Sequence, residues 1–143
     1  MSEFNADQFM QTPVEGALET EFTPIPEGEY RAVIKEVKPD TTSKGSPYLE
    51  VIWIIDDQGV RDLIGMDEPT SRQTVWLDVN ESGGLAFGAN KNVGLGKLRD
   101  ALGQNTGAPW SPNMLLGQPA TVNIKHRMGS EGGTFSEVKG VRA

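Results

Sequence analysis

Residues 91–103 read KNVGLGKLRDALG and form the one segment of the chain with a clear helical pattern. Leu95, Leu98 and Leu102 recur at the spacing that places side chains on one face of a helix, and the charged residues between them fall on the other faces. We therefore expect a short helix that buries its leucines against a core.

The residues around this segment supply the signals for its two ends. Asn90 or Asn92 can cap the start, and Gly103 can end the helix in a left-handed conformation. Everything before and after it has the pattern of strands and turns, so the predicted order is strands, one helix, then more strands.

Five segments alternate apolar and other residues with the two-residue period of a strand. These predicted strands cover residues 29–38, 48–55, 73–80, 119–127 and 134–141. In the second strand, Trp53 shares its face with Leu49, Val51 and Ile55. We expect Trp53 to lie in the core.

Three strands, a helix and two strands resemble the order of the OB-fold, a Greek-key barrel that binds oligonucleotides through strands 2 and 3 and nearby loops. The predicted fold is mainly all-β: a five-stranded OB-fold-like Greek-key barrel with one short helix between strands 3 and 4. We expect this domain over residues 27–143, preceded by an acidic arm over residues 1–26.

The charge of the chain is unevenly distributed. Of 143 residues with a net charge of −7, the first 30 contain seven acidic side chains and no Lys or Arg. The other 113 residues hold 13 acidic and 13 basic side chains, so the acidity belongs to the arm. The arm also carries scattered apolar residues, which leaves two interpretations open: a solvated tail, or a peptide that docks on a partner or on the protein's own basic groove.

A narrower resemblance rests on PEGEYRAVIKEVKP, SPYLEVIW, NVGLGKLRDALGQN and TFSEVKGV, which together span residues 26–141. In these segments the chain is similar to a bacteriophage family that includes single-stranded DNA-binding proteins. The resemblance implies a role in phage DNA replication or recombination. One departure is that such proteins often carry an acidic, partner-recruiting tail at the C-terminus, whereas this chain ends EVKGVRA.

Single-strand binding requires cations along the phosphates and aromatic faces on which bases stack. The aromatic candidates are Tyr48, Trp76 and Phe135, and Trp76 is the strongest because polar neighbours share its strand face. The cationic candidates are Lys35, Lys44, Arg72, Lys125, Arg127 and Lys139. Lys125 and Arg127 adjoin the glycine-rich loop 128–133, which we expect to curl over a ligand.

Catalytic patterns are weak, and we expect no enzyme activity, no cofactor and no metal. The segment beginning at Gly94 starts like a dinucleotide fingerprint, but Arg99 stands where the third glycine belongs. The chain has no cysteine and a single histidine, His126, which lacks an evident partner for base catalysis. Loop acids could hold a divalent cation, although such residues are usually only solvated: Asp56, Asp57, Asp62, Asp67 and Glu68.

Two classes of function remain from the sequence. The first is a sequence-tolerant single-stranded DNA-binding protein whose arm masks the groove or recruits phage or host replication and recombination proteins. The second is a β-rich structural or adaptor module of a phage particle, whose arm mediates protein–protein contacts. The sequence shows no signal peptide and no bilayer-spanning run, so we expect the host cytoplasm, no membrane partner and a possible homo-oligomer.

Overall fold

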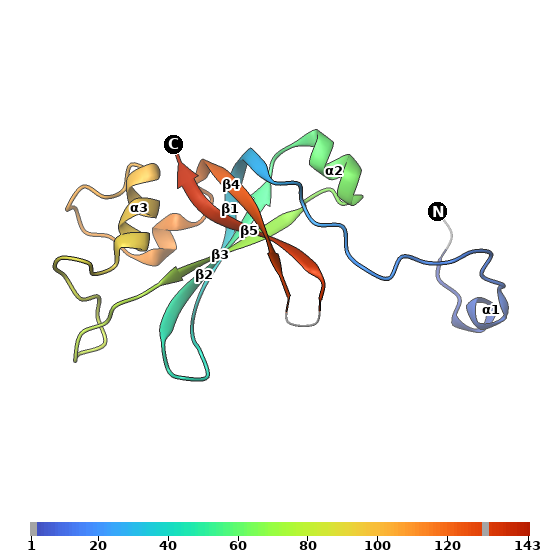
Figure 1. Cartoon of the computed structure of the whole chain (residues 1–143), viewed down its shortest axis with the longest axis horizontal. Coiled ribbons are helices and arrows are strands. Elements are labelled where there is room, and N and C mark those ends of the chain that lie inside the picture. The colour runs from blue at the N-terminus through green and yellow to red at the C-terminus, as the bar shows by residue number, and fades with distance from the viewer. Residues whose placement is uncertain (1–2, 130–131) are drawn as a thin grey trace.

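Five strands pair in the order β1-β2-β3-β5-β4 and close into a barrel, which Figure 1 shows with the N-terminal arm extending to one side. The computed structural model describes residues 3–129 and 132–143. The strands are β1 (Gly28–Thr41), β2 (Pro47–Ile55), β3 (Thr70–Trp76), β4 (Pro119–Met128) and β5 (Thr134–Arg142). Strands β3 and β5 run parallel and the other neighbours antiparallel, so the barrel is mixed. It is consistent with an OB-fold-like domain.

The interior is filled by alternate side chains of the strands. Val51, Trp53 and Ile55 of β2 are fully buried together with Val122 and Ile124 of β4. The prediction that Trp53 is a core residue is confirmed. Its indole N–H donates to Oε1 of Gln73 at 2.9 Å, which satisfies the one polar group of this side chain.

The predicted helix is present between β3 and β4 as α3 (Val93–Ala101). Leu95 and Leu98 are buried and Leu102 packs partly buried against the core, as their spacing predicted. Gly103 has a φ of 71°, the left-handed conformation expected after the helix. Asn92 occupies the N-cap position, but its side chain makes no capping hydrogen bond and binds the preceding loop.

Further helical segments lie where the sequence predicted only connections: α1 (Ala6–Gln11), α2 (Gln58–Ile64) and the 3-10 turn η1 (Pro112–Leu115). Among the described residues, helical segments hold 19% and strands 37%, and the presence of α1 and α2 beside the predicted helix shows that the expectation of a single helix was wrong. Helix α2 has seven residues and buries only Val60, so its apolar pattern is too short to indicate a helix from the sequence. Its ends are nevertheless well defined, since the Asp57 side chain accepts from the Val60 N–H and Gly65 is left-handed.

Strand β3 begins three residues before its predicted start and ends at Trp76, whereas the prediction ran over residues 73–80. Residues 70 and 71 already pair with β2, opposite Ile54 and Trp53. After Trp76 the chain leaves the sheet, because Asp78 is bound to Asn92 through its backbone and its side chain. Val79 is therefore exposed and makes only an isolated bridge to Leu85.

The arm is exposed along nearly all of its described length, and Figure 1 shows α1 away from the barrel. It joins the barrel at Ile25, which is buried and whose carbonyl accepts from Nε2 of His126 at 2.7 Å. The Tyr30 hydroxyl donates to the carbonyl of Pro26 at 2.8 Å, and the Glu27 side chain accepts from the His126 N–H at 2.9 Å. Among residues 3–129 and 132–143, no helix has the length and apolar character needed to cross a bilayer.

Candidate nucleic-acid interface

A groove of about 690 Å³ lies on the outer face of β2, β3 and β5. It forms there because the apolar residues of β2 and β3 point inward, which leaves their alternate neighbours outside. Tyr48 lies opposite Trp76 in the register of these strands, and Glu50 lies opposite Thr74. In OB-folds this strand pair is the surface that binds oligonucleotides.

Four aromatic side chains line this groove, and three of them, Tyr48, Trp76 and Phe135, are those predicted from the sequence. The rings of Tyr48 and Trp76 meet edge to face, with centroids 5.6 Å apart. Trp76 is 57% exposed and Phe135, across the groove on β5, is 45% exposed. Tyr48 thus supports one side of Trp76 and leaves much of the indole available for stacking.

Two arginines and two carboxylates lie among these rings. Nη1 of Arg72 is 2.8 Å from Oε1 of Glu50, and Nε of Arg127 is 3.4 Å from Oε2 of Glu137. The arginine side chains are largely exposed while the carboxylates are half-buried, so each guanidinium lies on the solvent side of its pair. A guanidinium has five N–H donors, and a carboxylate that uses one or two of them leaves others for a phosphate.

Arg127 also makes a second contact, with an aromatic ring. Its guanidinium carbon lies 5.5 Å from the centroid of Phe135, within the range of a cation–π interaction. The groove therefore combines a stacked cation and a half-exposed ring on β4 and β5 with an aromatic pair on β2 and β3.

Four of the nine predicted site residues lie outside this groove. Lys139 is 2.8 Å from Oε1 of Glu137 and lines the neighbouring cavity between β5 and α3. Lys125 is exposed on β4, in register with Glu137. Lys44 is exposed in the turn after β1, and Lys35 lies on β1 at the bulge between Ile34 and Glu36. The groove thus brings together Tyr48, Arg72, Trp76, Arg127 and Phe135.

The glycine-rich loop between β4 and β5 shapes the position of Phe135. A Cβ on Gly129 would lie 2.5 Å from Cε2 of Phe135, so a larger residue there must displace the ring. Gly129 and Gly133 also line a small hairpin cavity of about 520 Å³ with Arg127 and Phe135. The prediction that this loop closes over a ligand involves residues 130 and 131, which lie outside the described residues.

Sequence reasoning missed part of the groove wall. Phe22, Thr23 and Pro24 of the arm line it, although no strand pattern includes them. Ser71 also lines it and is buried, and within residues 3–129 and 132–143 its hydroxyl has no hydrogen-bond partner. The sequence did indicate a place for Glu137 in the groove, because the two-residue period of β5 puts Glu137 on the same face as Phe135.

The ionisable groups at the arm junction have structural roles. The hydrogen bond from the His126 N–H lowers the pKa of Glu27 below its ordinary value of 4.5, aided by the charge of Lys125. Burial and the nearby Asp57 raise the pKa of Tyr30 above 10.0. His126 itself donates from Nε2 to the Ile25 carbonyl, which ties the end of the arm to β4.

Three of the five acids considered as metal ligands have individual partners. Asp56 pairs with Arg61, Asp57 caps α2, and Asp62 accepts from the Gln58 amide. In the part of the chain that the structure describes, no three His, Asp or Glu side chains gather as a metal site.

No family model matches this chain and no curated protein matches it, so the family is not identified by comparison. The likeness to phage single-stranded DNA-binding proteins remains a prediction from the sequence, and the structure supports only an OB-fold-like barrel.

Proposed function

We propose that this protein binds single-stranded DNA with little sequence preference, in phage DNA replication or recombination in the host cytoplasm. The observation that carries the proposal is the position of Trp76: it is 57% exposed, supported by Tyr48, and faces Phe135 and two exposed arginines in one groove. An OB-fold assignment of the barrel belongs to the same proposal, since OB-folds bind oligonucleotides on this strand pair.

In this proposal the bases stack on the faces of Trp76 and Phe135, which accept any base because every base has a π-face. Arg72 and Arg127 bind the phosphates. Each phosphate competes with the carboxylate that now pairs with the arginine, so Glu50 and Glu137 hold the guanidinium groups in place and moderate the affinity. Binding releases counterions from the DNA and therefore weakens as salt rises.

The test is a titration of the protein with fluorescent oligo-dT at low and moderate salt, followed by anisotropy. We expect Trp76→Ala to weaken binding by roughly tenfold or more, since one base platform contributes about 1–3 kcal/mol. Phe9→Ala is the matched control, because Phe9 is 58% exposed and lies on the arm helix away from the groove. Absence of binding at low salt, or equal losses in both variants, would overturn the proposal.

A second candidate function is favoured by the arm. Six large apolar side chains are exposed along it and none belongs to the buried core, although Phe22 lines the groove: Phe4, Phe9, Met10, Val14, Leu18 and Phe22. Such a segment suits a structural or adaptor module that clamps a neighbouring subunit. This function predicts a large oligomer that resists salt and dissociates when residues 1–23 are removed, as measured by light scattering.

A further inference from the structure

The groove on the strand face does not end at Trp76. A second cavity of about 460 Å³ lies between β3, β5 and α3, and it shares Thr74, Trp76 and Glu137 with the groove. A third cavity of about 520 Å³ lies between α3 and the loop before it, and it shares Lys97 with the second. Because neighbouring cavities share lining residues, the three follow one another from Phe135 to helix α3, and we call this series the track.

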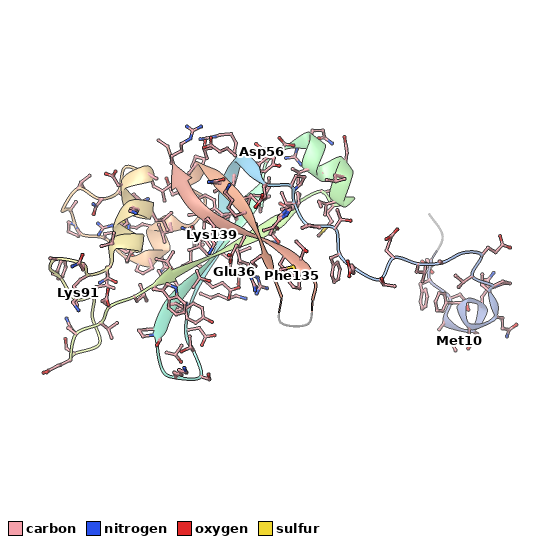
Figure 2. The ribbon with its side chains drawn as sticks, viewed as in Figure 1. Met10, Glu36, Asp56, Lys91, Phe135 and Lys139 are labelled. Carbon is pink, nitrogen blue, oxygen red and sulfur yellow. The ribbon has the colours of Figure 1, made fainter. Side chains whose placement is uncertain are left out.

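The far end of this track has the same chemistry as the strand face. Phe87 is 91% exposed in the third cavity, beside the exposed side chains of Lys91 and Lys97. Neither lysine makes an ion pair with the residues that the structure describes. Figure 2 shows Lys91, Lys139 and Phe135 spread in that order across the molecule.

The loop that carries Phe87 is held in place by partly buried hydrogen bonds. The Asn92 side chain accepts from the Asp78 N–H at 2.8 Å and donates to the carbonyls of Asp78 and Ala86 at 2.9 Å. Asp78 in turn accepts from the Asn92 N–H at 2.8 Å. Phe87 follows directly on Ala86, so the residue before the exposed ring is fixed to the start of α3.

Two glycines of α3 line these cavities. Gly94 lines the second cavity and Gly96 the third, and both are inside the helix. Neither needs to be glycine for its backbone or its neighbours. An added Cβ at Gly94 would come no closer than 4.0 Å to Val75, and one at Gly96 would meet nothing within 4 Å.

We propose that single-stranded DNA bound on the strand face continues past Trp76 over α3, where Lys97 and Lys91 bind further phosphates and Phe87 stacks a base. This inference rests on the proposed function and adds a second contact region to it. Asp100 lines the third cavity as well, but the two lysines outnumber it. The occupant is single-stranded DNA because its phosphates can pair with the cations of the track and its bases can stack on the aromatic rings.

The test compares a short oligo-dT of about 5 nucleotides with a long one of about 16, near the two limits of site size for one OB-fold. We expect the double variant Lys91→Ala, Lys97→Ala to weaken binding of the long oligomer by about tenfold. A plot of the logarithm of the binding constant against the logarithm of salt concentration should have a slope about 1.4 smaller in magnitude for this variant, because each phosphate contact to a single strand contributes about 0.7. Binding of the short oligomer should change less than about twofold, since it occupies the strand face alone.

Two substitutions at Gly96 give a matched comparison. Gly96→Glu places a negative charge in the track and should weaken binding of the long oligomer, whereas Gly96→Gln, which adds a side chain of the same size without the charge, should weaken it less. If the variants bind the long oligomer as the parent does while Trp76→Ala still weakens it, the extension over α3 is wrong and the strand-face function stands. If the parent binds neither oligomer, both proposals are overturned.

Discussion

The two faces of the β2–β3 ribbon use tryptophan in opposite ways. Trp53 on the inner face has no exposed surface, and its indole N–H is bonded to Gln73. Trp76 on the outer face is 57% exposed and rests against Tyr48. Trp53 packs in the interior of the barrel, whereas much of the Trp76 side chain remains exposed to water after folding. A large aromatic surface that folding does not bury is available for a ligand.

The largest effect should follow from the inner face. Trp53→Ala removes a fully buried side chain from the centre of the barrel, and we expect it to lower the free energy of unfolding by about 3–5 kcal/mol. Urea denaturation followed by circular dichroism measures this loss. A loss below about 1 kcal/mol, smaller than typical for any large-to-alanine core change, would mean that Trp53 does not organise the core.

The outer face should show the reverse pattern. Trp76→Ala should change the free energy of unfolding by less than about 1 kcal/mol, since surface substitutions usually have small effects. A loss comparable to that of Trp53→Ala, measured in the same denaturation experiment, would show that Trp76 is a structural residue. The contrast between the two faces would then be lost.

The carboxylates of the outer face should limit affinity. Glu137→Gln releases Arg127 and Lys139 from their shared partner, and we expect oligo-dT to bind up to about fivefold more tightly at low salt, because exposed ion pairs contribute about 0.2–1 kcal/mol. Glu29→Gln is the control, as Glu29 pairs with Arg142 outside the groove. Equal affinities for Glu137→Gln and the parent protein, measured by anisotropy, would show that the pairs do not compete with phosphate.

The smallest effect concerns the junction of arm and barrel. The pKa of Glu27 is lowered in the folded protein, so its carboxylate stabilises the fold above pH 4.5 and loses this effect as the pH falls through the lowered pKa. Glu27→Gln should therefore reduce the urea midpoint slightly at pH 7. At pH 3 the difference from the parent should shrink, and a difference that grows with acidification would contradict the assigned role.

The inner face was largely predictable from the sequence. Burial imposes a two-residue period on strands and a helical period on α3, which is why Trp53 and the leucines of α3 were placed correctly. Local hydrogen bonds impose no such period. Helix α2, which buries only Val60, and the early end of β3, which depends on Asp78 and Asn92, were therefore missed.

The candidate site was predictable only in part. Tyr48, Trp76 and Phe135 could be chosen because a large aromatic among polar neighbours on a strand is unusual. That they share one groove depends on the barrel closing β3 beside β5, through the pair Arg72 and Glu137, which no local pattern reveals. The contributions of the arm and of α3 to the track likewise depend on contacts between segments distant in the sequence.

The most direct test of the outer-face role is to titrate the parent protein, Trp76→Phe and Trp76→Ala with oligo-dT, following tryptophan fluorescence and anisotropy together. If Trp76 is the stacking platform, the parent shows quenching on binding, and Trp76→Phe loses most of the quenching but keeps its affinity within a few-fold, about 1 kcal/mol. Trp76→Ala should lose the quenching and roughly tenfold or more in affinity. Unchanged affinity in Trp76→Ala, or unchanged quenching in Trp76→Phe, would contradict the assignment of Trp76 to single-stranded DNA binding.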